Sequence, residues 1–177
     1  MKTISVPSRN DVSASNQALF DALKSKLGFV PNLYATIAHS ENALGTYLAL
    51  QSAKSTLSAK EREVINLVVS QVNECRYCLA AHTAIGKMVG FSDAQIIDIR
   101  KGRATFDSKL DALAVLVRSM TVNRGKVDAA SQERFFTAGY TEGHLVDAIV
   151  VVGDKIITNY LHAATQVPVD FPEAPAL

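Results

Sequence analysis

Apolar residues recur every three or four positions along almost the whole of this 177-residue chain, which is the spacing of one helix face. Residues 13–27 show the pattern clearly. The run from 149 to 152 is β-branched, but it lies inside a long periodic segment, and that length favours a helix over a strand. The sequence therefore predicts an all-α fold without strands.

Capping and turn residues divide this pattern into separate helices. Ser58 with Glu61, and Ser92 with Gln95, have the spacing of a capping box, and Gly90 is well placed as a C-terminal cap. An irregular tail with three prolines is expected from 167 to 177. The expected helices are residues 13–27, 33–54, 58 to a break near 73 and 74, 76–88, 92–102, 107–123, 128–138 and 141–165.

The chain also resembles itself at an offset of 49 residues. Residues 90–98 parallel residues 139–147, and the same offset aligns Leu67 with Leu116 and Ser70 with Ser119. The match predicts a pseudo-repeat, a helical unit present twice. The chemistry does not repeat, so one half would be active and the other scaffold. Under this offset Glu63, Cys75, Cys78 and His82 match Ala112, Arg124, Val127 and Ser131.

Length and composition predict one soluble domain over residues 1–177. Hydrophobic residues make up 48% and charged residues 20%, and a net charge of +1 indicates neither a nucleic-acid nor a membrane partner. The N-terminus shows no signal peptide, and the longest apolar stretch, 148–152, is too short to span a bilayer. We therefore expect a cytoplasmic protein, in a compartment where structural disulfides are uncommon.

The two cysteines of the chain, Cys75 and Cys78, lie three residues apart, with His82 four residues further on and Glu63 twelve residues before the pair. On a helix, His82 sits one turn beyond Cys78 on the same face. A close cysteine pair in a reducing compartment is more often catalytic or metal-binding than a structural link. The spacing therefore predicts a thiol redox site.

The expected roles follow from these positions. His82 can take the proton of Cys78, and Glu63 can orient the imidazole if the two helices pack antiparallel. The Cys78 thiolate would attack a hydroperoxide and become a sulfenic acid, and Cys75 would condense with it to a disulfide. An external dithiol would then reduce this disulfide by exchange.

The pattern Glu-x11-Cys-x-x-Cys-x-x-x-His, from Glu63 to His82, resembles the active-site motif of the AhpD-like alkylhydroperoxidases in the carboxymuconolactone decarboxylase superfamily. The likeness is specific from about 58 to 102. It implies an AhpD-like helical bundle, a trimer or hexamer, and peroxidase activity with Cys78 attacking the hydroperoxide. It also implies a protein or lipoyl dithiol as reductant, and neither a metal nor another cofactor.

This sequence departs from that family at Tyr77. The best-known form of the family has a histidine directly before the second cysteine, whereas a tyrosine is a poor base near neutral pH. A shorter proton relay and a slower peroxidase are therefore expected. Decarboxylases of the superfamily typically lack the cysteine pair, so lactone decarboxylation is not expected.

Two other functions remain open at this stage. The chain could be a dithiol–disulfide oxidoreductase that acts on a protein or lipoyl disulfide. Alternatively, it could be a non-enzymatic redox-sensing or zinc-binding module, in which Cys75, Cys78 and His82 would supply three ligands. Glu61 lies near Glu63, and we expect it only to cap its helix.

Overall fold

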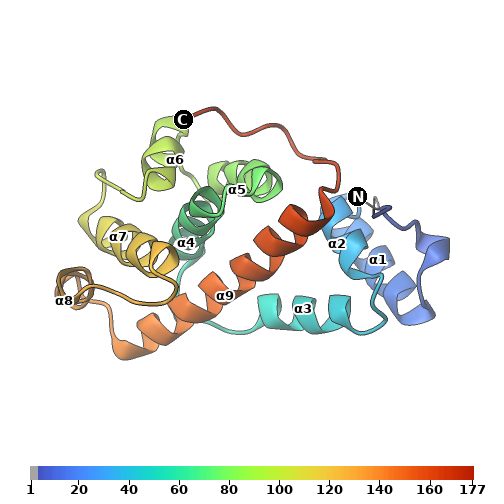
Figure 1. The fold of residues 1–177 in the computed structure, drawn as a ribbon, viewed down its shortest axis with the longest axis horizontal. Helices are drawn as coiled ribbons and strands as arrows, with labels where there is room; N and C mark the ends of the chain where they lie inside the picture. Colours follow the sequence, from blue (N-terminus) through green and yellow to red (C-terminus); the bar gives the residue numbers. More distant parts are fainter. Residues whose placement is uncertain (1–3) are drawn as a thin grey trace. The chain divides into compact units, whose positions relative to one another are not determined.

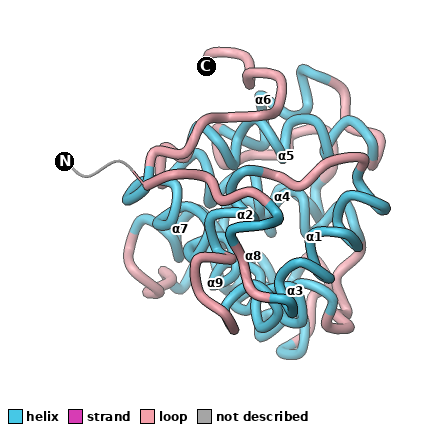
Figure 2. The backbone as a smooth tube through the Cα atoms, turned by 90° about the vertical axis from the view of Figure 1, so that its right-hand side faces the viewer, coloured by secondary structure: helices cyan, strands magenta, loops and turns pink. Residues whose placement is uncertain are grey.

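The computed structural model describes residues 4–177, which form helices and loops with no strand (Figure 2), so the all-α prediction is confirmed. Residues 1–3, part of the segment in which no signal peptide is predicted, lie outside the described residues. The helices are a 3-10 helix Arg9–Asp11, α1 Ala14–Leu27, α2 Asn32–Ile37, α3 Ala43–Ser52, α4 Ala59–Val72, α5 Arg76–Met88, α6 Asp93–Arg100, α7 Ser108–Val122, α8 Ala129–Thr137 and α9 Glu142–Thr165.

The chain divides into two compact units. The first extends to Lys54 and includes Tyr160–Asp170, and the second comprises Ser55–Asn159 with Phe171–Leu177. That residues 1–177 form one domain stays a prediction.

Helix α4 is the centre of the second unit, where it packs against α5, α6 and α7; Figure 1 shows α4 beside α5 and α7. The nearly continuous apolar run of α4 explains this position, because a helix that is apolar all round is stabilised by burial on every side. Each residue from Glu63 to Ser70 is buried. Polar side chains on this helix therefore lie inside the protein and need partners there.

Helix boundaries in the second unit agree with a pseudo-repeat at the predicted offset. Helix α7 begins 49 residues after α4 begins, α9 begins 49 residues after α6, and α8 ends 49 residues after α5. Gly90 and Gly139, one offset apart, both adopt a left-handed backbone with φ of +93° and +91°. Each stands just after a helix, where glycine adopts this conformation without strain.

In the first unit, the prediction of one helix over 33–54 is wrong, because the chain turns between α2 and α3. The buried amide of Asn16 donates hydrogen bonds to the carbonyl oxygens of Ala38 (3.1 Å) and Ser40 (3.0 Å). A continuous helix would use both carbonyls internally. The Ser40 hydroxyl also accepts a hydrogen bond from the N–H of Ala43, at the start of α3 (3.3 Å). A side chain distant in sequence, that of Asn16, therefore stabilises the break together with the local Ser40 cap.

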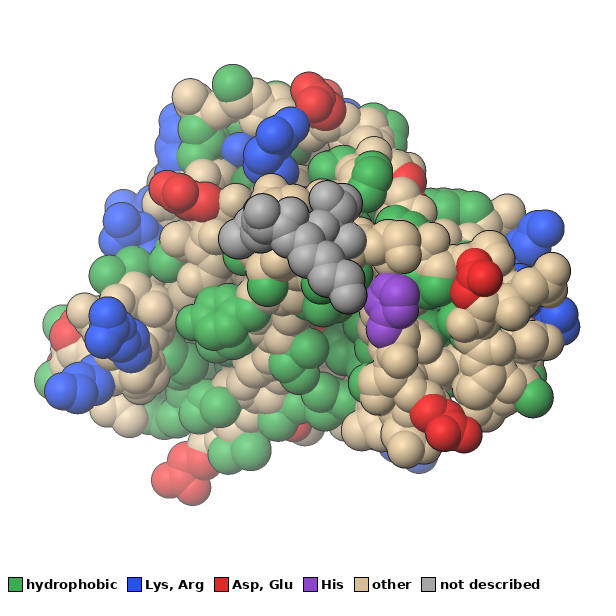
Figure 3. Space-filling model, turned by 45° about the vertical axis from the view of Figure 1, so that its right-hand side comes forward, with side chains coloured by type: hydrophobic (Ala, Val, Ile, Leu, Met, Phe, Trp, Pro, Cys, Tyr) green, Lys and Arg blue, Asp and Glu red, His purple; other side chains and the backbone are tan. Residues whose placement is uncertain are grey.

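Nowhere in residues 4–177 does a helix combine the length and the apolar character needed to cross a membrane. Hydrophobic side chains nevertheless reach the surface, as the green areas of Figure 3 show for one face. On α9 they recur at helical spacing, at Val146, Ile149, Val150 and Ile157.

Candidate active site

The cysteine pair begins directly after the turn that joins α4 to α5. The N–H of Cys75 donates to the Ser70 carbonyl (2.9 Å), and the N–H of Glu74 donates to the Gln71 carbonyl (3.1 Å). Glu74 adopts a left-handed backbone with φ of +53°. These are the two bonds and the backbone conformation of a Schellman motif. The motif ends α4 and makes Cys75 the N-cap residue of α5.

Asn159 on α9 ties this turn to the rest of the second unit. Its carbonyl oxygen accepts a hydrogen bond from the amide of Asn73 (2.9 Å), and its own amide donates to the Ser70 hydroxyl (3.4 Å). Ser70 is fully buried, and its backbone carbonyl is the acceptor for Cys75. The position of the first cysteine is therefore linked to both α4 and α9.

The two cysteines are joined by a disulfide bond, with their Cα atoms 5.3 Å apart. Each residue is only 2% exposed. The Cys75 sulfur also accepts a hydrogen bond from the backbone N–H of Cys78 (3.3 Å), as an N-cap side chain does. The structure thus shows the pair in its oxidised form, at the start of a helix whose free N–H groups favour a thiolate after reduction.

The structure brings Glu63 and His82 together, as the spacing predicts. The Nδ1–H of His82 donates to the Glu63 carboxylate (2.8 Å), and the Asn66 amide donates to the other oxygen of that carboxylate (2.8 Å). All three residues are buried. Asn66 was not predicted from the sequence, although it stands three residues after Glu63 on the same helix, where side chains meet.

The Glu63 carboxyl is held in its charged form. Burial raises its pKa, but the charge and hydrogen bond of His82, the Asn66 amide and the charge of Lys155 together outweigh burial, so the net pKa lies below the ordinary value. A carboxylate in this position keeps the Nδ1 proton on His82 and leaves Nε2 as the reactive nitrogen.

Lys155 on α9 is, with Asn66, a residue of this site that the sequence did not predict. Its Nζ lies 2.9 Å from His82 Nε2 and 3.9 Å from the Asp154 carboxylate, and the residue is 3% exposed. One feature of the sequence could have indicated it: Lys155 is the one Lys or Arg within the sequence of α9. In the described part of the chain, no hydrogen bond joins His82 to either sulfur, because both of its nitrogens have other partners.

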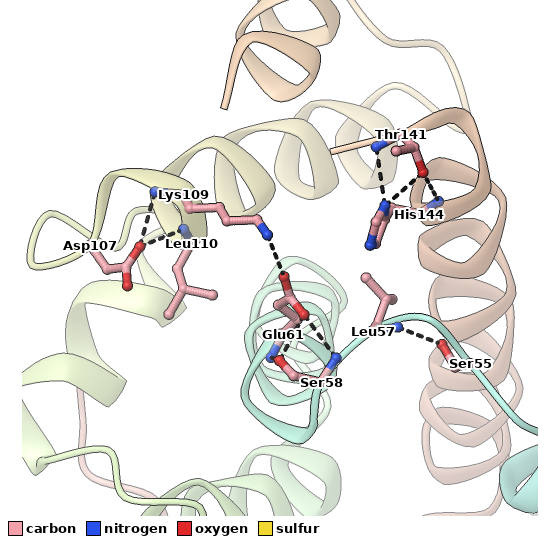
Figure 4. Close-up of polar contacts among 9 residues, drawn as sticks. All are labelled: Ser55, Leu57, Ser58, Glu61, Asp107, Lys109, Leu110, Thr141 and His144. Carbon is pink, nitrogen blue, oxygen red and sulfur yellow. Dashed lines mark hydrogen bonds and ion pairs between the residues drawn. The ribbon is translucent and has the colours of Figure 1, made fainter. Parts of the chain in front are cut away.

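Glu61, the neighbouring carboxylate, serves the fold. It accepts hydrogen bonds from the N–H (2.8 Å) and hydroxyl (2.7 Å) of Ser58 and lies 3.7 Å from the Lys109 ammonium (Figure 4). Ser58 in turn accepts a bond from the Glu61 N–H, which completes the predicted capping box. In Figure 4, the Glu61 side chain points toward Ser58 and Lys109, so Glu63 is the carboxylate of the candidate site.

Tyr77 is buried, and its ring meets that of Phe171 edge to face, with centroids 5.7 Å apart. Phe171 belongs to the irregular C-terminal tail. Tyr77 therefore packs against this tail, and a role for Tyr77 beside the thiols stays a prediction. Within residues 4–177, no three His, Cys, Asp or Glu side chains are arranged to hold a metal ion.

Comparisons with known proteins agree with this fold. Residues 38–117 match the model of the Carboxymuconolactone decarboxylase family. A search of curated proteins gave no match. A crystal structure of a peroxidase-related protein from Silicibacter sp. TM1040 matches with a TM-score of 0.80 and 24% sequence identity. The match covers 94% of this chain and 90% of that chain.

Two further solved structures have a similar fold. An alkylhydroperoxidase AhpD core protein from Ralstonia eutropha JMP134 is 20% identical with a TM-score of 0.84, over 94% of this chain and 91% of its own. The debrominase Bmp8, in complex with 2,3,4-tribromopyrrole, is 15% identical with a TM-score of 0.78. That match covers 96% of this chain and 93% of the debrominase chain. Since these neighbours carry different activities in their names, fold alone does not define the reaction of this chain.

Proposed function

We propose that this chain is a thiol-dependent peroxidase that reduces alkyl hydroperoxides. Residues 38–117 match the carboxymuconolactone decarboxylase family model, and the fold is similar to that of an AhpD core protein, which supports the proposal. One observation carries the proposal. A buried Glu63–His82 pair, joined over 2.8 Å, lies one helical turn from a cysteine pair that forms a disulfide. This arrangement combines a nucleophile, an oriented base and a second thiol.

The proposed cycle begins when His82 takes the proton of the Cys78 thiol. The thiolate attacks the hydroperoxide; a sulfur–oxygen bond forms, the O–O bond breaks, and the leaving alkoxide receives a proton from His82. Cys75 then attacks the Cys78 sulfenic acid, which gives the disulfide and water. Glu63 orients His82 and stabilises the imidazolium in both proton transfers.

An external dithiol of the protein or lipoyl type would complete the cycle by thiol–disulfide exchange. Both cysteines are almost fully covered, so a narrow dithiol reaches the sulfurs more easily than a broad protein surface. Such a cycle suits a reducing compartment, and we therefore propose the cytoplasm as its location.

Dithiol–disulfide exchange with a protein or lipoyl partner is the second candidate. The same disulfide supports it, because a Cys-x-x-Cys pair that forms a disulfide can serve dithiol–disulfide exchange as well as peroxide reduction. In that case peroxide turnover would be incidental. A redox-sensing or zinc-binding module remains a third candidate.

We also propose a homo-oligomer, a trimer or hexamer. The apolar side chains on the exposed face of α9 support it, since Val146 and Ile149 are 60% and 49% exposed and lie on one helix face. Light scattering tests this proposal, and a monomer at working concentration would contradict it.

The deciding experiment counts free thiols, and measures intact mass, before and after one equivalent of cumene hydroperoxide. A peroxidase loses both thiols and about 2 Da, the mass of two hydrogens. Cys78→Ser should leave Cys75 reduced, whereas Cys75→Ser should accumulate oxidised forms of Cys78. Thiols that do not react with the hydroperoxide, but are rapidly oxidised by a disulfide partner, would favour the exchange enzyme. One zinc per chain in the purified protein would favour the zinc module.

A further inference from the structure

Lys155 occupies a position where an isolated ammonium is unfavourable. The residue is 3% exposed, and removing a charge from water is costly unless partners compensate it. Charged and titratable groups approach it from three helices: Glu63 on α4, His82 on α5 and Asp154 on α9 itself. The contact at hydrogen-bond distance is to His82 Nε2, at 2.9 Å.

This contact limits the number of protons. A nitrogen–nitrogen hydrogen bond needs one donor and one acceptor, so an imidazolium and an ammonium cannot face each other across it. His82 and Lys155 therefore hold at most one positive charge together, and the Glu63 carboxylate on Nδ1 balances that charge when the pair carries it. That proton lies either on Lys155 Nζ or on His82 Nε2. The two forms interconvert when the proton moves across the 2.9 Å contact between these nitrogens.

We propose that Lys155 is a positioning residue that shares this proton with His82, so that the pair first removes the proton of Cys78 and later protonates the leaving oxygen. The inference rests on the proposed function. A proton shared between the two nitrogens places one positive charge one helical turn from Cys78, and that charge stabilises the Cys78 thiolate.

The proton balance closes over a complete cycle. The pair takes one proton from the Cys78 thiol and gives it to the alkoxide formed when the O–O bond breaks. The thiol proton of Cys75 leaves with the hydroxyl group of the sulfenic acid as water. When the external dithiol reduces the disulfide, its two protons restore the two thiols, and one of them returns to the pair as the Cys78 thiolate forms.

The test uses the full-length chain with Cys75→Ser, in which Cys78 is the one thiol. Its rate of alkylation by iodoacetamide, measured against pH, reports thiolate formation without any peroxide. Adding Lys155→Met removes the charge and keeps an unbranched side chain of similar size. The alkylation curve should move to higher pH, with the rate at neutral pH lower by about tenfold, and oxidation of Cys78 by cumene hydroperoxide should slow by about 10²-fold.

Lys155→Arg separates charge from proton transfer. A guanidinium does not lose its proton in proteins, so this variant should recover thiolate formation but not the peroxide rate. Thr158→Val is the matched structural control. Thr158 is buried on the same helix and its hydroxyl donates to the Lys155 backbone carbonyl (3.0 Å), away from the Lys155 ammonium, so both curves should stay as in the parent.

The two hypotheses fail separately. An alkylation curve and a peroxide rate that stay within about twofold of the parent in Lys155→Met would overturn the role of Lys155. A parent protein inert to the hydroperoxide, with an alkylation curve that still moves in Lys155→Met, would overturn the peroxidase and retain the shared proton. Circular dichroism and the melting temperature confirm that each variant is folded.

Discussion

Two glutamates stand two residues apart on α4, and each is buried, yet their surroundings give them different tasks. Glu61 lies in the first turn, where it bonds Ser58 and pairs with Lys109 at the edge of the protein. Glu63 lies two residues further along α4, where its partners are Asn66 and His82, and through His82 it reaches Lys155. Their partners, rather than the residue type or its burial, therefore distinguish the carboxylate that we propose for the chemistry.

Replacing Glu63 should have the largest effect. Glu63→Gln keeps the shape but removes the charge that balances the proton shared by His82 and Lys155. We expect peroxide-driven oxidation of Cys78 to fall by about 10²- to 10⁴-fold, the range typical of general acid–base groups. Stopped-flow measurement of thiol loss against pH checks this. A rate equal to that of the parent would place the functional carboxylate elsewhere.

Replacing Glu61 should affect stability instead. Glu61→Ala removes half of the capping box and the ion pair with Lys109, and we expect unfolding free energy to fall by about 1–2 kcal/mol. Glu61→Gln is the matched control, since glutamine can still cap but cannot pair, and it should lose at most about 1 kcal/mol. Urea unfolding measures both losses. Peroxide rates should match the parent, and a large loss of rate in either variant would end the distinction between the two glutamates.

The difference between these two glutamates shows where sequence reasoning reaches its limit. The fold class, most helix bounds and the Glu61 capping box depend on local spacing, and the sequence predicts them. The cysteines and His82 lie within one helix and its cap, so their proximity is also a local property. Whether these residues work as a site remains for the experiments above.

Features that depend on distant segments could not be predicted in the same way. Lys155 reaches His82 from 73 residues away, and one lysine in an apolar helix does not indicate its partner. The break within 33–54 depends on Asn16, more than 20 residues earlier. In both cases a polar side chain on another element completes the structure, and helical periodicity carries no information about it.

The stability that the charge of Glu61 contributes should depend on pH in the acid range. Burial raises the pKa of Glu61, but the hydrogen bonds from Ser58 and the charge of Lys109 help to give a net pKa below the ordinary 4.5. A lowered pKa in the folded state adds stability above 4.5, and that stability is lost as the pH falls through the folded pKa. The stability difference between the parent and Glu61→Gln should therefore shrink from pH 6 to about pH 3. A constant difference in urea midpoints would show that the charge contributes nothing.

A third glutamate should give the smallest effect, because it uses neither its charge nor its side chain. Glu74 is exposed, and in the described residues its carboxylate has no hydrogen bond or ion pair; its backbone, with φ of +53°, forms the Schellman turn. Glycine adopts this conformation without strain, so Glu74→Gly should raise the unfolding free energy by up to about 1 kcal/mol. Glu74→Ala removes the charge but keeps the strain, and it should change little. Equal gains in the two variants would mean that the charge, not the backbone, is unfavourable at the turn before Cys75.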